Sequence, residues 1–403
     1  MNSRRVLASA AAVFAVALVV RTDARQLHDT FANWLDHPAI DYTSAPTSDA
    51  VAELNRRLVD GSATLTFDGA SGYLRSVLAA LDVPVESQIA VFAKDSAQQA
   101  RINMHNPRTL FFNDTVSVGW VRGGFIELVA QDPRQGMIFY VLDQAPGGRP
   151  RFARRDDCLT CHHSYSTAGV PGVLVRSAGE FAVNHTLPID RRWGGWYVTG
   201  RQVPAQHRGN VDFDRLFEAP VTRAPNWPSF SAQFDTSGYL SSYSDVAALM
   251  VFEHQMHLMN LLTRIGWEAR VQQPTMPLAD AAREVVDYML FVDEAPLEDT
   301  IAGSSGFVER FEAMGPRDKM GRSLRQVDLR TRLMRHPCSY MVYAPVFDAL
   351  PGRAKEAIYQ RLWQVLSGTL RDAAYKNLSR TDRQAIVEIL RDTKPDLPAY
   401  FRS

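Results

Sequence analysis

Five consecutive residues of this 403-residue chain have types and spacing that can do chemistry together. Cys158 and Cys161 stand three positions apart, and His162 directly follows the second cysteine. Two thiols at this spacing reach the two vinyl groups on one edge of a porphyrin, and the adjacent imidazole is carried under the iron. The C-x-x-C-H pattern therefore predicts one covalently attached haem c, with His162 as the proximal iron ligand.

Two other chemistries use the same residue types. A zinc site would combine the two cysteines with His162 or His163 and a distant fourth ligand, but structural zinc usually brings a second close Cys or His pair. A thioredoxin-like dithiol follows a strand, and the residues before Asp157 have no strand pattern. With 3 Cys and 10 His in the chain, an accidental match is expected in roughly one shuffled sequence in two thousand. Haem is the preferred interpretation, and both alternatives stay open.

The second axial position of the iron decides between electron transfer and ligand chemistry. Residues 245–267 predict a helix that is apolar almost all round, with one polar stripe at 100° per residue. The stripe contains Glu253, His257, Asn260 and Arg264. His254 lies beside it on the apolar side, so we predict His254 as the candidate sixth ligand. His257 and His185 are weaker candidates.

This polar stripe has two interpretations, which lead to different functions. A stripe that meets solvent is the ordinary case on a helix. A stripe that faces a haem would supply distal acid, base and charge-stabilising groups from Glu253, His254, His257 and Arg264. The favoured function is a monohaem electron carrier, which needs a redox partner protein. The alternative is a haem-dependent oxidoreductase that resembles a peroxidase.

Arginines are the natural partners of haem propionates, because their planar guanidinium matches a carboxylate. Five of them flank the motif on both sides. They are Arg151, Arg154, Arg155, Arg191 and Arg192. For any one of them, a solvated position on a basic surface is the simpler expectation.

The N-terminus has the pattern of an export signal. Arg4 and Arg5 precede an uninterrupted small and apolar run over residues 6–20, and Arg21 follows it. Such a pattern predicts a signal peptide or N-terminal anchor over residues 1–25, although the run is shorter than the about 20 residues of a membrane span. Because haem is joined to c-type proteins after export, the expected location is the periplasm or the outer face of the cytoplasmic membrane. Any membrane contact would come from an uncleaved anchor.

Composition limits the remaining partners. Lys plus Arg equals Asp plus Glu at 44 each, so no excess charge points to nucleic acid. Three cysteines are too few for a disulfide scaffold in a chain of this length. Cys338 is expected to be a buried, inert thiol.

The pattern of elements predicts an α+β fold, with a small antiparallel sheet before the haem motif, a loop-rich haem-binding segment and a large C-terminal helical region. The expected regions are 26–150 for helices plus antiparallel sheet, 151–210 for the haem-binding segment and 211–403 for the helical region. Strands are expected at 109–112, 116–121, 125–129 and 137–142. Helices are expected at 49–59, 69–81, 246–266, 278–293, 304–313, 321–334, 352–371 and 380–392.

Several short blocks extend beyond the motif. They are Phe111-Phe112-Asn113-Asp114, Val118-Gly119-Trp120-Val121, Asp157-Cys158-Leu159-Thr160-Cys161-His162, Gly194-Gly195-Trp196-Tyr197-Val198-Thr199-Gly200 and Pro337-Cys338-Ser339-Tyr340. With these blocks the chain resembles a family of exported bacterial proteins described only as cytochrome c domain-containing, over most of residues 110–370. The resemblance implies haem and export, and it supplies no substrate.

Overall fold

The computed structural model describes residues 34–180, 182–212, 214–217 and 223–402. The predicted signal peptide or anchor over residues 1–25 lies outside the described residues. The chain forms two compact units, residues 1–46 and residues 47–403. In the first unit, the described residues form turns closed by backbone bonds such as Tyr42 N to Leu35 O at 2.9 Å. The sheet, the motif and the C-terminal helices all lie in the second unit.

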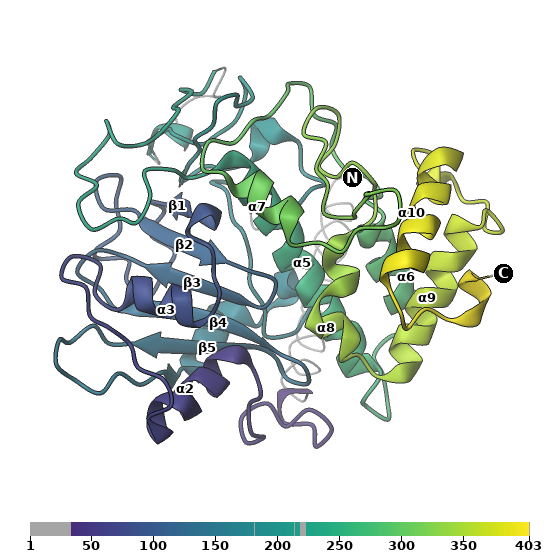
Figure 1. The fold of residues 1–403 in the computed structure, drawn as a ribbon, viewed down its shortest axis with the longest axis horizontal. Coiled ribbons are helices and arrows are strands. Elements are labelled where there is room, and N and C mark those ends of the chain that lie inside the picture. Colours follow the sequence, from purple (N-terminus) through teal and green to yellow (C-terminus); the bar gives the residue numbers. More distant parts are fainter. Residues whose placement is uncertain (1–33, 181, 213, 218–222, 403) are drawn as a thin grey trace, which may run out of the picture. The chain divides into compact units, whose positions relative to one another are not determined.

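A seven-stranded antiparallel sheet is the centre of the described part of this second unit (Figure 1). Its strand order is β6-β5-β4-β3-β2-β1-β7. The strands are β1 (Ile89–Val91), β2 (Arg108–Phe112), β3 (Val116–Trp120), β4 (Ile126–Asp132), β5 (Gly136–Leu142), β6 (Ala153–Arg154) and β7 (Trp196–Tyr197). The four predicted strands are confirmed as β2 to β5. Strands β1, β6 and β7 have two or three residues each, too few for an alternating pattern to reveal them.

Local hydrogen bonds at the turns fix the register of the central strands. Asn113 Oδ1 accepts from the backbone N–H groups of Thr115 and Val116, both at 2.9 Å, which closes the β2–β3 hairpin. Asp132 Oδ1 accepts from the N–H groups of residues 134 and 135 in the β4–β5 turn. Gly136 completes that turn at φ +93°, a conformation that a residue with a side chain rarely adopts.

The register assigns side chains to the two faces of the sheet, because paired residues share a face. Leu110 pairs with Gly119, Gly119 with Glu127, and Glu127 with Val141. We call the face that carries these four residues the motif face, since Phe139, two residues along from Val141, contacts His162. The other face carries Tyr140.

Nine helices are found among the described residues. They are α2 (Ala50–Asp60), α3 (Leu74–Ala80), α4 (Leu159–His162), α5 (Val246–Glu268), α6 (Leu278–Met289), α7 (Phe307–Ala313), α8 (Pro345–Asp348), α9 (Gly352–Leu366) and α10 (Arg380–Thr393). Together with the sheet they confirm the α+β class and the C-terminal helical region. In the part of the chain that the structure describes, no helix is both long and apolar enough to cross a membrane.

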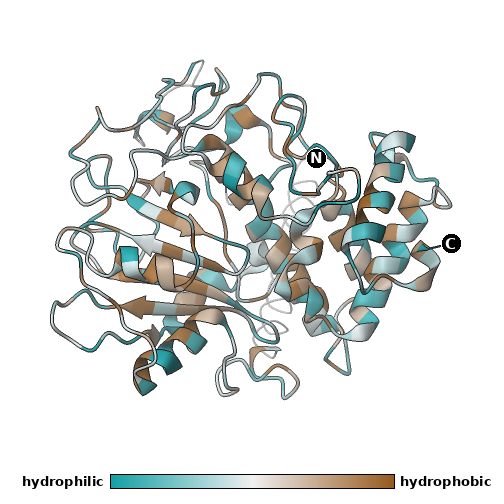
Figure 2. Cartoon of the chain, in the orientation of Figure 1, coloured by the Kyte–Doolittle hydropathy of each residue, from teal (hydrophilic) through white to brown (hydrophobic). Residues whose placement is uncertain are grey.

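Helices cover the two faces of the sheet differently. Helix α2 lies over the face opposite the motif, where the Tyr140 hydroxyl donates to its N-cap Asp49 at 2.7 Å. Helix α5 lies over the motif face, where Phe252 packs on Phe112 with ring centroids 5.0 Å apart. Figure 1 shows α2 and α3 in front of the sheet and α5 behind it. In Figure 2 hydrophobic residues gather on the strands and on the surfaces of the helices that pack together.

One expected helix differs from the structure. Residues 321–334 form turns instead of a helix, because Asp328 Oδ1 accepts from the backbone N–H groups of residues 330 and 331, which competes with helical bonding. The expected haem segment 151–210 supplies β6 and β7 to the common sheet and lies within the larger unit.

Candidate functional site

The motif cysteines lie on a short helical segment directly after the edge strand β6. A 3-10 turn over Asp156–Cys158 continues into α4. Because Cys158 and Cys161 are three residues apart on helical backbone, their side chains share one face. Both thiols are free; Cys161 is exposed and Cys158 is half-buried. The two sulfur atoms can thus reach one edge of the same planar group.

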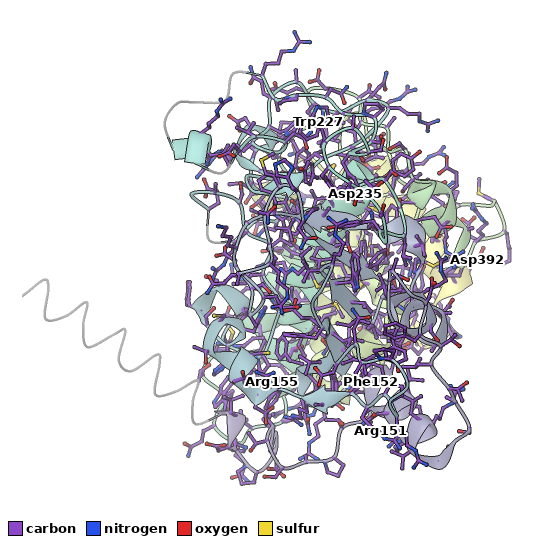
Figure 3. The ribbon with its side chains drawn as sticks, turned by 90° about the vertical axis from the view of Figure 1, so that its left-hand side faces the viewer. Arg151, Phe152, Arg155, Trp227, Asp235 and Asp392 are labelled. Atoms are coloured by element: carbon purple, nitrogen blue, oxygen red, sulfur yellow. The ribbon has the colours of Figure 1, made fainter. Side chains whose placement is uncertain are left out.

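The segment that leads into the motif is itself tied to the fold. Figure 3 shows Arg151, Phe152 and Arg155 together on this segment. The backbone of Phe152 exchanges two hydrogen bonds with the Asn55 amide of α2, and Arg155 N donates to Phe139 O of β5 at 2.9 Å. The start of the motif is therefore held against the sheet.

His162 has one ring nitrogen fixed and one free. Nδ1 lies 2.9 Å from the carbonyl oxygen of Gly172, and the ring packs on Phe139 with centroids 4.8 Å apart. Burial lowers the pKa of His162, so the imidazole is neutral at pH 7 and donates Nδ1–H to that carbonyl. No described residue hydrogen-bonds to Nε2. The Nε2 lone pair is therefore available to a metal, with the tautomer set by Gly172.

The polar stripe of α5 is covered by the chain that follows the motif. Glu253 contacts Arg192, the Asn260 amide bonds to the backbone of Val173, and Arg264 Nη1 donates to Ala168 O at 2.7 Å. Glu253 and Asn260 are 0% and 1% exposed. The expectation that this stripe meets solvent is therefore wrong. The stripe faces residues 168–193.

Glu253 is a buried carboxylate with two protein donors. Arg192 Nη1 lies 3.2 Å from its Oε2, and Trp193 Nε1 donates to its Oε1 at 2.7 Å. Burial raises the pKa of Glu253 to about 7, and the Arg192 charge opposes this rise. Glu253 and Arg264 thus hold the chain that follows the motif in place.

His254 is fully buried with both ring nitrogens engaged. Its Nε2 lies 2.7 Å from Ser339 Oγ, and its Nδ1 lies 2.9 Å from Nδ1 of His185. Because neither nitrogen is left for an iron, this geometry disfavours His254 as the sixth ligand. His185 is equally buried, and its ring stacks on Tyr288 of α6 with centroids 4.1 Å apart.

His257 differs from these two histidines. It is half-buried, and it makes no hydrogen bond to any described residue. Burial lowers its pKa to about 4, so its nitrogens are neutral. Its ring packs on Tyr288 of α6 with centroids 4.6 Å apart, against the same residue on which His185 stacks.

Charged residues of the motif face lie near His162. Arg108 Nη1 donates to Glu127 Oε2 at 2.9 Å, and Arg176 Nη1 lies 3.7 Å from Asp95. Arg108, Glu127 and Arg176 all act electrostatically on His162. Sequence reasoning missed these residues. A partial signal existed, because Arg108 begins a mainly apolar strand and Glu127 interrupts the apolar residues at the start of β4.

The five arginines that were considered as partners of the propionates have other partners or surroundings. Three form ion pairs near the surface, and Arg192 is buried with Glu253. The three pairs are Arg154–Asp156, Arg155–Asp157 and Arg191–Glu180. The Nη1 atom of Arg151 is buried without a hydrogen-bond partner among the described residues. Arg108 and Arg176 are better placed for a propionate, since they lie near His162.

Zinc and dithiol chemistry would use the same two thiols. Among the residues that the structure describes, no three His, Cys, Asp or Glu side chains gather as a metal site. Burial raises the pKa of the Cys158 thiol to about 11, so the unligated thiol is protonated at pH 7. A strand, β6, does precede the motif, contrary to expectation, but it is a two-residue antiparallel edge strand. Cys338 is buried, and burial raises its pKa to about 12, as expected of an inert thiol.

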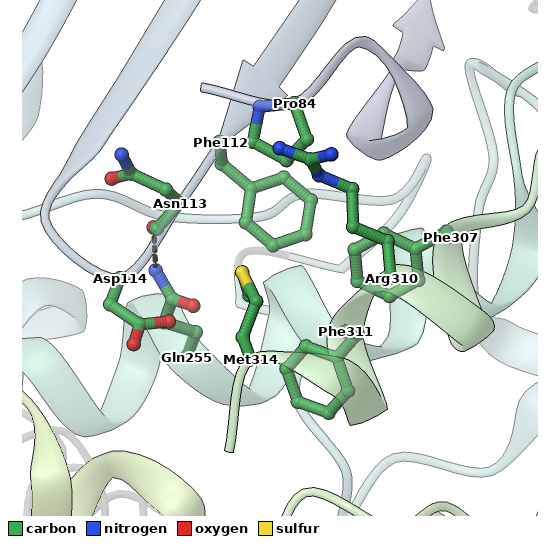
Figure 4. Close-up of a pocket in the computed structure, with 9 residues that line it drawn as sticks. All are labelled: Pro84, Phe112, Asn113, Asp114, Gln255, Phe307, Arg310, Phe311 and Met314. Carbon is green, nitrogen blue, oxygen red and sulfur yellow. Dashed lines mark hydrogen bonds between the residues drawn. The ribbon is translucent and has the colours of Figure 1, made fainter. Parts of the chain in front are cut away.

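A narrow pocket lies between β2, α5 and α7, away from the motif. Figure 4 shows the Gln255 amide in its wall, donating to Asn113 O at 2.7 Å. The other lining residues are Pro84, Phe112, Asp114, Phe307, Arg310, Phe311 and Met314. None of the motif residues lines this pocket.

The arrangement around the motif fits a covalent haem: two free thiols on one helical face and an imidazole whose Nε2 has no described protein partner. Comparison of the chain with protein-family models, with curated proteins and with solved structures gave no match in any of the three.

Proposed function

We propose that this protein is a monohaem c-type cytochrome that carries single electrons in the cell envelope. Cys158 and Cys161 would hold the haem through thioether bonds, and His162 would bind its iron. The observation that carries the proposal is the Nδ1 hydrogen bond of His162 to Gly172, which leaves Nε2 without a hydrogen-bond partner among the described residues. When bound, haem c supplies one-electron redox chemistry.

The residues of this chain would bind and orient that group. Leu110 and Val129 are half-buried apolar side chains on the motif face beside Glu127, and they offer surface to a porphyrin. Arg108 and Arg176 would pair with the propionates, because Arg forms strong hydrogen bonds to carboxylates. Phe139 and the Gly172 carbonyl fix the ring plane of His162.

The cellular setting follows from the same chemistry. A haem attached after export, together with the export pattern of residues 1–25, supports a periplasmic protein or one on the outer face of the cytoplasmic membrane. A single haem exchanges one electron at a time, so the proposal includes a redox partner protein.

A haem-dependent oxidoreductase is the second candidate. The observation that favours it is the engagement of both nitrogens of His254 in hydrogen bonds, so that the predicted sixth ligand has no unengaged nitrogen for the iron. An iron without a strong sixth ligand binds peroxide or other small molecules. Against this candidate, Glu253 and Arg264 are bound to the chain around them and offer no open distal acid or charge.

The test is to express the full chain with a c-type haem maturation system. Mass spectrometry under denaturing conditions then measures covalent haem in the wild type, in Cys158→Ser with Cys161→Ser, and in the control Cys338→Ser. We expect covalent haem in the wild type and the control, and none in the double variant. Retained haem in the double variant, or none in the wild type, contradicts the proposal.

The same samples separate the two candidate functions. Electron paramagnetic resonance and optical spectra that show low-spin, six-coordinate iron insensitive to carbon monoxide favour the carrier. High-spin iron that binds carbon monoxide favours the oxidoreductase.

A further inference from the structure

A buried asparagine of α5 clamps the backbone next to the hydrogen-bond acceptor of His162. Asn260 is 1% exposed. Its Oδ1 accepts from Val173 N at 3.2 Å, and its Nδ2 donates to Val173 O at 2.9 Å. One side chain therefore satisfies both polar groups of the residue that follows Gly172.

Gly172 is tied to His162 by two bonds. Its N–H donates to the His162 carbonyl at 2.8 Å, and its carbonyl accepts from His162 Nδ1 at 2.9 Å. A Cβ at position 172 would lie 2.2 Å from Asn260 Oδ1 and 3.1 Å from Thr167 Cβ. The amide of Asn260 thus packs directly on the α-carbon of Gly172, which is possible only because this residue has no side chain.

From these contacts we infer that Asn260 is a positioning residue for the proximal ligand. It holds residues 172 and 173 in place, and their position fixes the length and angle of the His162 Nδ1 hydrogen bond. The inference rests on the proposed function, since it requires that His162 binds the iron. It extends that function by naming the residue, about a hundred positions along the chain, that sets the electronic character of the ligand.

The polarity of the His162 Nδ1–H group links the clamp to the iron. A short, well-aligned hydrogen bond from Nδ1–H to a carbonyl makes the imidazole a stronger donor to the metal, and changes to such partners alter metal properties. A stronger donor stabilises the oxidised iron more than the reduced iron. If the clamp is removed, this hydrogen bond loosens and the midpoint potential of the haem rises.

The chain contains a control for this clamp. Asn210 is 4% exposed, and it makes the same two bonds to a single residue, accepting from Val198 N and donating to Val198 O, both at 2.7 Å. Its Nδ2 also donates to Pro225 O at 2.9 Å, and its φ of +64° lies in the left-handed region. Asn210→Ala therefore removes the same kind of bond pair and one further bond from a different part of the fold. It should cost at least as much stability as Asn260→Ala, without removing a bond to residue 172 or 173.

The experiment compares the haem-loaded wild type with Asn260→Ala and Asn210→Ala. Spectroelectrochemistry gives the midpoint potential, and hydrogen exchange followed by nuclear magnetic resonance in the reduced state gives the exchange rate of the His162 Nδ1 proton. We expect a higher potential and an exchange rate at least about tenfold faster in Asn260→Ala. We expect neither change in Asn210→Ala. Asn260→Ser serves as a milder variant with the same expected direction if Asn260→Ala is not recovered.

Two results would overturn the inference, and they are distinguishable. If Asn260→Ala or Asn260→Ser carries covalent haem with the wild-type potential and exchange rate, the clamp does not act on the ligand, and the proposed function stands. If Asn210→Ala changes the potential and the exchange rate as much as Asn260→Ala does, the effect is not specific to the clamp, and the inference also fails. If the wild type binds no haem, the proposed function fails and this inference fails with it.

Discussion

Two neighbouring arginines offer a direct test of how the chain after the motif is held. Arg191 pairs with Glu180 near the surface, with side chains 54% and 20% exposed. Arg192 pairs with Glu253 in the interior, with side chains 2% and 0% exposed. The two pairs share residue types and differ in burial. We predict that Arg192→Gln destabilises the protein far more than Arg191→Gln.

The expected magnitudes follow from the contacts. An exposed ion pair contributes about 0–1 kcal/mol, so Arg191→Gln should cost less than about 1 kcal/mol. Arg192→Gln leaves Glu253 buried without its counterion, and it removes the donors to Leu187 O at 2.6 Å and His185 O at 2.9 Å. Breaking a buried pair in this way costs about 3–5 kcal/mol.

The cost of Arg192→Gln should also depend on pH. The folded-state pKa of Glu253 is raised from 4.5 to about 7 by burial. Stability from its protonated form is therefore fully present below pH 4.5 and is lost as the pH rises to about 7. The Arg192 charge lowers this pKa, so its removal raises the pKa further and extends the loss above pH 7. A pKa moved above pH 8 adds up to about 1.4 kcal/mol to the cost at pH 8 relative to pH 6, because the carboxyl then keeps its proton across that whole interval.

The assay is urea unfolding of the haem-loaded wild type and both variants at pH 6 and pH 8, followed by circular dichroism. The midpoint and slope together give the free energy of unfolding. Equal losses for the two variants would refute the assignment of Arg192 as a buried structural cation. A cost for Arg192→Gln that does not grow with pH would refute the role of the Glu253 carboxylate.

Two further predictions concern charge and pH. Arg108→Gln should lower the midpoint potential of the haem, because a cation near His162 favours the reduced iron. Arg154→Gln, which removes a cation from a surface pair, should leave the potential unchanged. Spectroelectrochemistry measures both, and equal potentials in Arg108→Gln and the wild type would contradict the prediction. Burial lowers the pKa of His207 to about 4, so stability is lost as the pH falls from 6.5 toward 4, by about 1.4 kcal/mol per pH unit. His207→Asn keeps an acceptor for Gly209 N and removes the titrating imidazole. The free energy of unfolding, measured with urea between pH 5 and 7, should then depend less steeply on pH, by the uptake of one proton. An unchanged dependence on pH would contradict the prediction.

The elements that the sequence predicts well are those with a long, regular pattern. Strands β2 to β5 have an apolar, β-branched pattern and are separated by turns that contain Asn or Gly. Helix α10 has a clear N-cap, Ser379, whose Oγ accepts from Asp382 N at 3.0 Å. The motif also predicts that the two cysteine side chains lie on one helical face, because residues three positions apart share a face of a helix. These predictions depend on contacts between residues close in the chain.

The features that the sequence does not reveal depend on contacts between distant residues. Strand β7 forms because Tyr197 pairs with Ala90, more than a hundred positions earlier, and two residues carry no periodic signal. The engagement of His254 depends on Ser339 and His185, neither of which is near it in sequence. Arg108 and Glu127 come near His162 through the register of the sheet, which the sequence of a single strand does not contain.

The polar stripe of α5 illustrates why two interpretations were too few. Residues 168–193 contain little regular structure, so their backbone N–H and C=O groups need partners from elsewhere. The stripe supplies them, since Asn260 bonds both groups of Val173 and Arg264 bonds the carbonyl of Ala168. A polar stripe on an otherwise apolar helix therefore has a third possible role besides meeting solvent or a cofactor. It can satisfy the backbone of an irregular segment, and here that segment carries the acceptor of the predicted iron ligand.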